Sequence, residues 1–202
     1  MIAHEVAHSW TGNLITNAKW PDFWLNEAFT VLTEMKVIQR MEGFSKYIAS
    51  SYLGKFKLDR TIKSLGENHP FTALVPDLYQ TSPEDAFTSV PYEKGFLFLK
   101  YLQVTQSFNQ FVRVFFSKSV VGEEFFWDFY RAYVSTFQYE SISSAQFQNF
   151  FVDFVIRNHE EDGQSLIDQI DFHKWLYGTG YPSYYLDYDN QDVNIPIQLA
   201  KE

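Results

Sequence analysis

Apolar side chains recur every three or four positions along most of the chain, which is the spacing of residues on one face of an α-helix. Between residues 23 and 41 this spacing predicts a helix of about five turns, which ends at Gly43. Its apolar positions are Leu25, Phe29, Leu32, Met35 and Ile38. The same spacing predicts further helices over residues 45–65, 92–106, 108–119, 123–137, 144–158 and 165–176.

Caps and breaks set the expected ends of these helices. A first helix is expected to run through residues 4–8 and to stop near Gly12. Ser45 is the expected cap of the helix over 45–65. The inward-facing residues of that helix are expected to be Tyr52, Phe56 and Ile62. Residues 66–83 contain three prolines and are expected to form a long loop, a kind of segment that is often functional in a compact domain.

Strand patterns are missing from this sequence. No segment of any length alternates apolar and polar residues, and no repeat, glycine-rich phosphate loop or nucleophile elbow is present. The pattern therefore predicts a mainly α fold of seven or eight helices.

The composition indicates an aromatic-rich core and a negative net charge. Of the 202 residues, 46% are hydrophobic and 19% aromatic, with 21 Phe and 13 Tyr. Sixteen basic and 25 acidic side chains give a net charge of −9, which argues against nucleic acid and anionic membrane as partners and favours an amine-bearing substrate. The chain has no cysteine and no apolar run long enough to span a membrane. Its first residues are not expected to be a signal peptide, because His4 and Glu5 interrupt the apolar positions. We therefore expect a cytoplasmic protein.

The candidate chemistry lies in the first 27 residues. His4 and His8 are four positions apart, so a helix places both imidazoles on one face, where they can bind one cation. Glu5 lies about 100° further round the helix, close enough to act as general base on a metal-held water. Glu27, in the next predicted helix, is the natural third ligand, since catalytic zinc takes three protein ligands and leaves a fourth position open. This predicts one Zn²⁺ per chain, bound by His4, His8 and Glu27.

The other candidates each have a second interpretation. A His-Glu-x-x-His pattern alone arises by chance, and it is Glu27 on the following helix that favours a metal site. Glu34 lies two turns further on the same face as Glu27, where it can orient a ligand histidine through the free ring N–H or simply face solvent. His69 is expected to be an ordinary surface histidine. His173 has no companion ligand and is expected to be structural or exposed.

Three segments resemble the catalytic domain of the gluzincin zinc aminopeptidases, most nearly the branch that contains leukotriene A4 hydrolase. They are residues 4–13 (HEVAHSWTGN), 24–27 (WLNE) and 90–95 (VPYEKG). Residues 175–177 (WLY) are also similar to that branch. The resemblance implies a thermolysin-like metallopeptidase catalytic domain over residues 1–177, truncated before its upstream sheet. Residues 178–202 would then be an irregular linker to an absent C-terminal helical domain.

The resemblance also implies an activity, the hydrolysis of N-terminal residues from peptides with a free N-terminus. In the family, the tyrosine that matches Tyr92 donates its O–H to the oxyanion of the reaction. The glutamate that holds the substrate amine lies upstream of residue 1 in the family, so contacts with missing N- and C-terminal domains are expected. One departure is Ala28, where the family usually has glycine and where a methyl group is expected to crowd the site slightly.

Two alternatives to a simple aminopeptidase stay open. One is a bifunctional epoxide hydrolase similar to leukotriene A4 hydrolase. Its lipid reaction uses an aspartate and a tyrosine at the positions that here are Glu84 and Phe87, so this second activity is expected to be weak or absent. The other alternative is a non-catalytic helical scaffold or a truncated product. The complete ligand set His4, His8 and Glu27 argues against decay of the site, whereas the missing upstream segment argues for an inactive fragment.

Overall fold

Helices make up most of the structure, a computed structural model that describes residues 2–104, 122–159, 162–184 and 186. The α-helices are α1 (Ile2–Ala7), α2 (Trp24–Glu42), α3 (Phe44–Leu65), α4 (Val90–Val104), α5 (Gly122–Phe137), α6 (Ser144–Asn158), α7 (Gly163–Ile167) and α8 (Phe172–Tyr177). Three short 3₁₀ helices are η1 (Trp20–Asp22), η2 (Pro70–Thr72) and η3 (Pro83–Ala86). The mainly α fold that the periodicity predicts is confirmed. The predicted helix over 108–119 lies outside the described residues.

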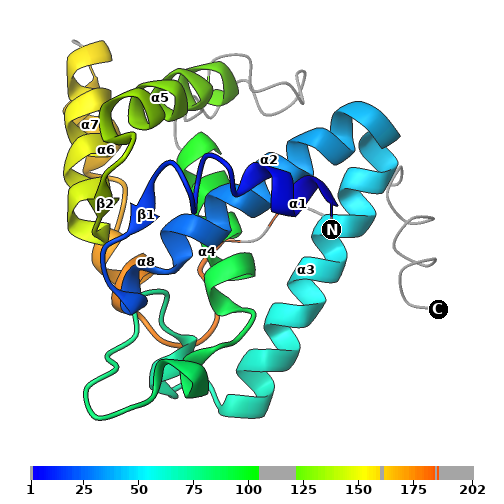
Figure 1. Ribbon diagram of the computed structural model, residues 1–202. Helices are drawn as coiled ribbons and strands as arrows, with labels where there is room; N and C mark the ends of the chain where they lie inside the picture. Colours follow the sequence, from blue (N-terminus) through cyan, green and yellow to red (C-terminus); the bar gives the residue numbers. More distant parts are fainter. Residues whose placement is uncertain (1, 105–121, 160–161, 185, 187–202) are drawn as a thin grey trace.

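Two helices form the centre of the fold, α2 and α4, which pack closely along each other. Figure 1 shows α3 flanking this pair on one side, while α5 and α6 lie on the other. The short α1 lies along α2, and α3 also packs on α4. None of the described helices is both long and apolar enough to cross a membrane.

Aromatic rings fill the core between α2, α4, α5 and α6. Trp24 is fully buried and contacts the rings of Phe98 and Phe147. Its indole N–H donates to the hydroxyl of Ser144 (2.8 Å), and the N–H of Ser144 donates to the buried carboxylate of Asp22 (2.8 Å). Buried polar groups need such partners, so this network fixes the start of α2 against the start of α6.

Small differences from the expected elements have local causes. A parallel pair of two-residue strands, β1 (Thr16–Asn17) and β2 (Ser141–Ile142), was not predicted, because two residues are too few to show alternation. The helix predicted over 165–176 is divided into α7 and α8. The side chain of Asp171 accepts the N–H of Lys174 and so caps a new helix.

The inward face of α3 also differs from its prediction. Phe56 is 54% exposed, so its predicted inward orientation is wrong, and no side chain caps the helix, so the predicted cap at Ser45 is also wrong. Small buried residues mark the true inner face, among them Ser51 and Gly54. A Cβ on Gly54 would lie 2.2 Å from an oxygen of Glu93. The small residues therefore allow α4 to approach, a signal that apolar spacing does not contain.

A buried lysine connects three distant segments. Lys94 of α4 is 2% exposed, and its ammonium group donates to the backbone carbonyls of Thr72 (2.8 Å), Gly178 (2.8 Å) and Gly180 (3.1 Å). Burial lowers the pKa of Lys94 to about 8. An ammonium group has three N–H donors, and here all three have acceptors. The loop before α4 and the segment after α8 are thus attached to the same side chain.

The helices α2 and α4 approach each other closely at Ala28 and Gly95. Ala28 is fully buried, and a Cβ built on Gly95 would lie 2.7 Å from the Ala28 methyl carbon. The methyl group that departs from the usual family glycine therefore lies against α4, and the glycine at 95 provides the space for it.

Gly95→Ala is expected to lower the free energy of unfolding by about 1–3 kcal/mol, because the new methyl group overpacks a dense interior. Urea unfolding followed by circular dichroism measures the change. Adding Ala28→Gly should restore most of the loss, since the double variant removes one of the two clashing methyl groups. Equal stability of Gly95→Ala and the unmodified protein would contradict this account.

Candidate metal centre

The two histidines of the predicted pair lie at the end of α1. His4 is within the helix, and the N–H of His8 donates to the carbonyl of His4 (3.2 Å), so helical hydrogen bonding continues one residue beyond Ala7. The ring centroids of His4 and His8 are 4.8 Å apart. Because α1 packs along α2, both rings face the first turn of α2, where Glu27 lies.

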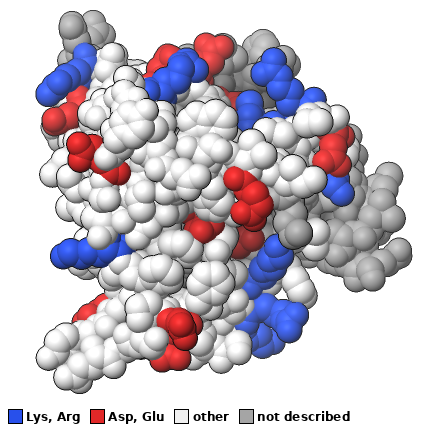
Figure 2. Space-filling view, in the orientation of Figure 1, with Lys and Arg blue, Asp and Glu red and all other residues white. Residues whose placement is uncertain are grey.

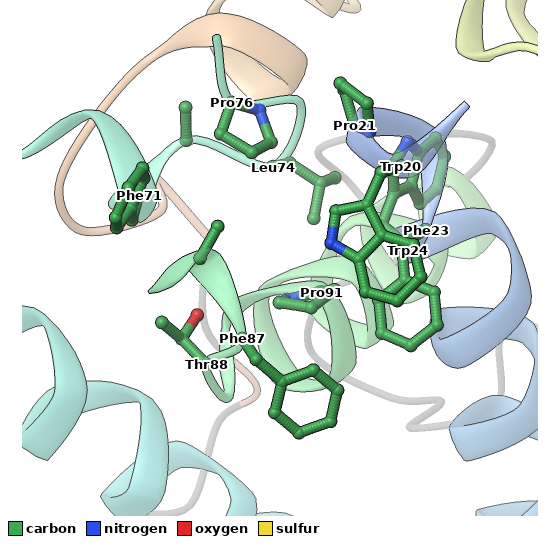
Figure 3. A pocket seen from close by; sticks show the side chains of 12 residues that line it. Trp20, Pro21, Phe23, Trp24, Phe71, Leu74, Pro76, Phe87, Thr88 and Pro91 are labelled. Atoms are coloured by element: carbon green, nitrogen blue, oxygen red, sulfur yellow. The ribbon is translucent and has the colours of Figure 1, made fainter. Parts of the chain in front are cut away.

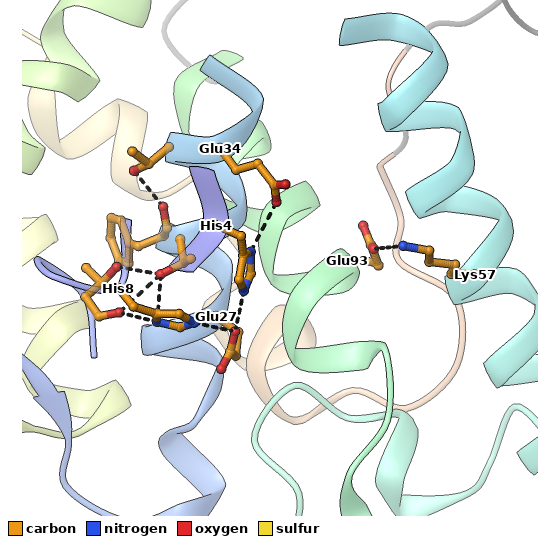
Figure 4. A network of polar contacts seen from close by, with 10 residues as sticks. His4, His8, Glu27, Glu34, Lys57 and Glu93 are labelled. Carbon is orange, nitrogen blue, oxygen red and sulfur yellow. Dashed lines mark hydrogen bonds and ion pairs between the residues drawn. The ribbon is translucent and has the colours of Figure 1, made fainter. Parts of the chain in front are cut away.

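Glu27 brings one oxygen to both rings. Its Oε2 is 3.3 Å from Nε2 of His4 and 3.4 Å from Nε2 of His8, as Figure 4 shows. Two ligand atoms of a tetrahedral zinc site, each about 2.0 Å from the ion, are about 3.3 Å apart. The three candidate ligand atoms all lie within 4.8 Å of one another. The carboxylate oxygen is thus at the distance from each imidazole nitrogen that such an ion requires.

The opposite nitrogen of each ring has a partner that orients it. Nδ1 of His4 is 3.1 Å from a carboxylate oxygen of Glu34. Nδ1 of His8 is 2.9 Å from the carbonyl oxygen of Thr11 and 3.2 Å from the hydroxyl of buried Thr30. Carbonyl oxygens only accept, so Nδ1 of His8 carries the hydrogen and Nε2 keeps its lone pair for a metal.

The charges at this centre also suit a cation. Glu27 is 5% exposed, and among the described residues its Oε2 receives no hydrogen bond. A buried carboxylate oxygen without a donor is costly. The carboxylates of Glu27 and then Glu34 raise the pKa of His4 to about 9. The residues present therefore fit a divalent metal ion, which His4, His8 and Glu27 would hold.

Tyr92 and Glu5 lie beside the candidate ligands without joining them. Tyr92 is in the first turn of α4, and its ring stacks on that of His4 with 6.1 Å between centroids. Burial, followed by the charges of Glu27 and Glu5, raises the pKa of Tyr92 to about 12. Its phenol is therefore a proton donor at neutral pH. Glu5 is exposed on α1.

A narrow apolar cleft opens next to Tyr92. The rings of Phe23 and Phe87 both contact the Tyr92 ring, each at 6.2 Å between centroids. These two rings also line the cleft, which Figure 3 shows from close by. Its other lining residues include Trp20, Leu74, Pro76 and Pro91. Part of the long loop predicted over 66–83 therefore forms a wall of this cleft.

The sequence predicted the six polar residues of this region, but not the residues that orient the ring of His8. Thr30 was not identified, although it lies one turn after Glu27 on α2, where a hydroxyl can reach the same ring. His69 was expected to be an ordinary surface residue, whereas it is half-buried and its ring accepts the N–H of Phe71 at the start of η2. His173 is exposed, as expected.

Comparison with known proteins identifies the family. The Peptidase family M1 domain matches residues 1–119. The chain belongs to peptidase family M1. This confirms the resemblance drawn from residues 4–13, 24–27 and 90–95, and the family is one of metallopeptidases.

The alignments with named relatives cover the whole length of this M1 chain. It is 38% identical over 202 residues to leucine aminopeptidase 2 of Sclerotinia sclerotiorum, covering 100% of this chain and 30% of the relative. It is 36% identical to a leukotriene A-4 hydrolase homolog of Botryotinia fuckeliana, covering 100% of this chain and 28% of the relative. The chain thus spans about 30% of the length of these curated relatives.

Solved structures give the same fold. Native leukotriene A4 hydrolase from Saccharomyces cerevisiae matches with a TM-score of 0.76 and 35% identity, over 92% of this chain and 27% of that one. An M1 zinc metallopeptidase from Deinococcus radiodurans matches with a TM-score of 0.57 and 22% identity, over 89% of this chain and 33% of that one. The second similarity supports the fold alone.

Replacing His8 by alanine is expected to abolish stoichiometric metal binding, because it removes one of three ligands. Elemental analysis after dialysis against zinc should find about one zinc per unmodified chain and much less in the variant. His173→Ala removes an exposed histidine and is the matched control. Full zinc retention by His8→Ala would contradict the ligand assignment.

Proposed function

We propose that this chain carries the zinc site of an aminopeptidase, an enzyme that removes N-terminal residues from peptides. The observation that carries the proposal is the position of the buried Glu27 oxygen, 3.3 and 3.4 Å from two imidazole nitrogens whose rings are oriented from behind. His4, His8 and Glu27 would hold the ion. A bound zinc ion supplies a Lewis acid that acidifies water and polarises a carbonyl group.

Glu5 is proposed as the general base. It is on the same helix as both histidines but points about 100° away from their face, and its exposed carboxylate is accessible to water and substrate. It would take a proton from the attacking water and deliver it to the leaving amine. Glu34 would hold the ring of His4 through Nδ1.

Tyr92 is proposed to donate its O–H to the oxyanion that forms at the scissile carbonyl. The stacking of its ring on His4 supports this role, since it keeps the phenol beside the metal ligands. Its raised pKa, about 12, keeps the proton on the oxygen. One donor of this kind is worth about 3–4 kcal/mol of barrier.

The apolar cleft next to Tyr92 supports an apolar N-terminal residue in the substrate. It is lined by aromatic and aliphatic side chains from η1, the loop before α4 and the start of α4. Relatives carry the name leucine aminopeptidase 2, which agrees with such a cleft. We therefore propose peptides with a free amine and an apolar first residue as substrates.

Hydrolysis of a lipid epoxide is the second candidate, because one relative is named a leukotriene A-4 hydrolase homolog. Phe87 contacts Tyr92 and lines the cleft, but its ring offers no hydroxyl for hydrogen bonding. Glu84 lies in the first turn of η3 and is exposed. These two positions favour peptide hydrolysis as the main activity.

Glu5→Gln and Tyr92→Phe test the two catalytic roles. Glu5→Gln keeps the side-chain shape and removes the base, so kcat should fall by about 10²–10⁴ with zinc retained. Tyr92→Phe should lower kcat by about 10²–10³ with little change in KM. Steady-state kinetics and zinc content are measured together. A Tyr92→Phe variant in which only KM rises would contradict the oxyanion role.

The exopeptidase assignment is tested with three substrates, a leucyl anilide, its N-acetylated form and a fatty-acid epoxide. The full-length enzyme should cleave the free-amine anilide and leave the acetylated one intact, because an exopeptidase must fix the substrate ammonium near the metal. Product release is followed by absorbance and by chromatography. Equal cleavage of both anilides, or epoxide turnover as fast as peptide turnover, would contradict the proposal.

A further inference from the structure

The apolar cleft next to Tyr92 is narrow. Its free volume is about 20 Å³, which is room for roughly one or two water molecules. Each carbon atom of a leucine side chain takes up about as much space as one water molecule, so the methyl group of alanine fits this volume and a leucine side chain exceeds it. To admit leucine as the first residue of a substrate, the cleft must therefore widen.

Three segments line the cleft, and Figure 3 shows them on different sides of it. They are residues 20–24 in η1 and the start of α2, residues 71–76 in the loop after α3, and residues 86–91, which lead into α4. Widening requires at least one of these segments to move. The hydrogen bonds that hold each segment indicate which one it is.

The first two segments are held by buried groups. Trp24 is fully buried, and its indole N–H donates to the buried hydroxyl of Ser144 (2.8 Å). Thr72 is also fully buried, and its carbonyl accepts from the buried ammonium group of Lys94 (2.8 Å). A buried polar group that loses its partner is costly, so a displacement of either segment is unfavourable.

Residues 77–88, here called the cleft loop, are held much less firmly. None of them is buried, and the loop at the lower left of Figure 1 stands out from the body of the protein in Figure 2. The backbone hydrogen bonds of η3 stay within the loop, such as the one from Phe87 to Glu84 (3.2 Å). Among the described residues, one hydrogen bond connects the cleft loop to a part of the chain other than the residues directly after it. In that bond the indole N–H of Trp20 donates to the carbonyl of Pro83 (3.1 Å).

Trp20 is oriented for this bond by a contact outside the cleft loop. Its ring stacks on that of Phe23, with 5.0 Å between the centroids and 9° between the planes. The bond to Pro83 joins two neutral groups and is exposed to solvent. Water can replace either partner, so the net strength of such a bond is small and it breaks readily.

We propose that Trp20 controls the opening of the apolar cleft, by holding the cleft loop through Pro83 until a large apolar side chain displaces it. The inference rests on the proposed aminopeptidase function and names a residue that sets its preference for the first residue of the substrate. Phe87 belongs to the cleft loop and lines the cleft, so its displacement provides the added width. Opening costs the bond between Trp20 and Pro83, which lowers the affinity for leucine and leaves that for alanine unchanged.

Trp20→Phe tests this role, because it keeps an aromatic ring beside Phe23 and removes the N–H. In the zinc-loaded full-length enzyme, the ratio of kcat/KM for leucyl anilide to that for alanyl anilide should rise about 2- to 10-fold, mainly through a lower KM for the leucyl substrate. This is the equilibrium equivalent of one neutral hydrogen bond. Trp127→Phe is the matched control, since it removes an indole N–H that donates to Glu123 (3.3 Å) in α5, away from the cleft.

Limited proteolysis measures the opening of the cleft loop directly. Chymotrypsin cleaves after aromatic residues, and the loop contains Tyr79 and Phe87. The cleavage rate follows the population of the open form when opening is fast. Trp20→Phe should be cleaved at these residues about 2- to 10-fold faster than the unmodified enzyme, and Trp127→Phe at the unmodified rate. Mass spectrometry locates the cleaved bonds.

Equal cleavage of the cleft loop in Trp20→Phe and Trp127→Phe would overturn the inference, even with a raised preference for leucine, because a smaller ring alone enlarges the cleft. A leucyl-to-alanyl ratio that is unchanged or lower in Trp20→Phe would also overturn it. Both results leave the proposed function intact. If the full-length enzyme hydrolyses neither anilide, the proposed function fails, and the proteolysis comparison, which needs no substrate, then decides whether Trp20 holds the cleft loop.

Discussion

The carboxylate of Glu27 lies between two imidazoles, and much of the structure serves to hold it there. The same face of α2 that carries Glu27 also carries Thr30, which contacts His8, and Glu34, which contacts His4. One helix therefore supplies a candidate ligand and both supports for the two histidines. The start of that helix is fixed in turn, because Asn26 exchanges hydrogen bonds with Asn17 of β1 (3.0 and 2.7 Å).

This arrangement explains which features the sequence can predict. His4, His8, Glu27 and Glu34 are related by helical spacing, and spacing determines direction once a helix is assigned. The remaining question is how α1 and α2 lie together, and no local pattern answers it. The Asn26–Asn17 pair fixes this relation in space, together with the pairing of β1 with β2, in which Thr16 lies opposite Ser141, 125 positions later in the chain.

Where the prediction from sequence was wrong, small or polar residues determine the local structure. Phe56 has the periodicity of an inward residue, yet Ser51 and Gly54 define the inner face of α3 because α4 must approach there. Asp171 restarts a helix within a continuous helical pattern. Apolar spacing finds the helices because burial of apolar surface is the main driving force, but close approaches and caps depend on one or two atoms in the folded chain.

Lys94 has a consequence for how the first turn of α4 responds to the rest of the molecule. Its ammonium group holds the carbonyls of Thr72, Gly178 and Gly180, and Tyr92 is two residues before it. Lys94 thus connects three parts of the structure. They are the loop that forms a wall of the apolar cleft, the turn of α4 that carries Tyr92, and the segment that follows α8. A displacement of the backbone at Gly178 or Gly180 would therefore act on α4 two residues after Tyr92, without any contact to the metal ligands.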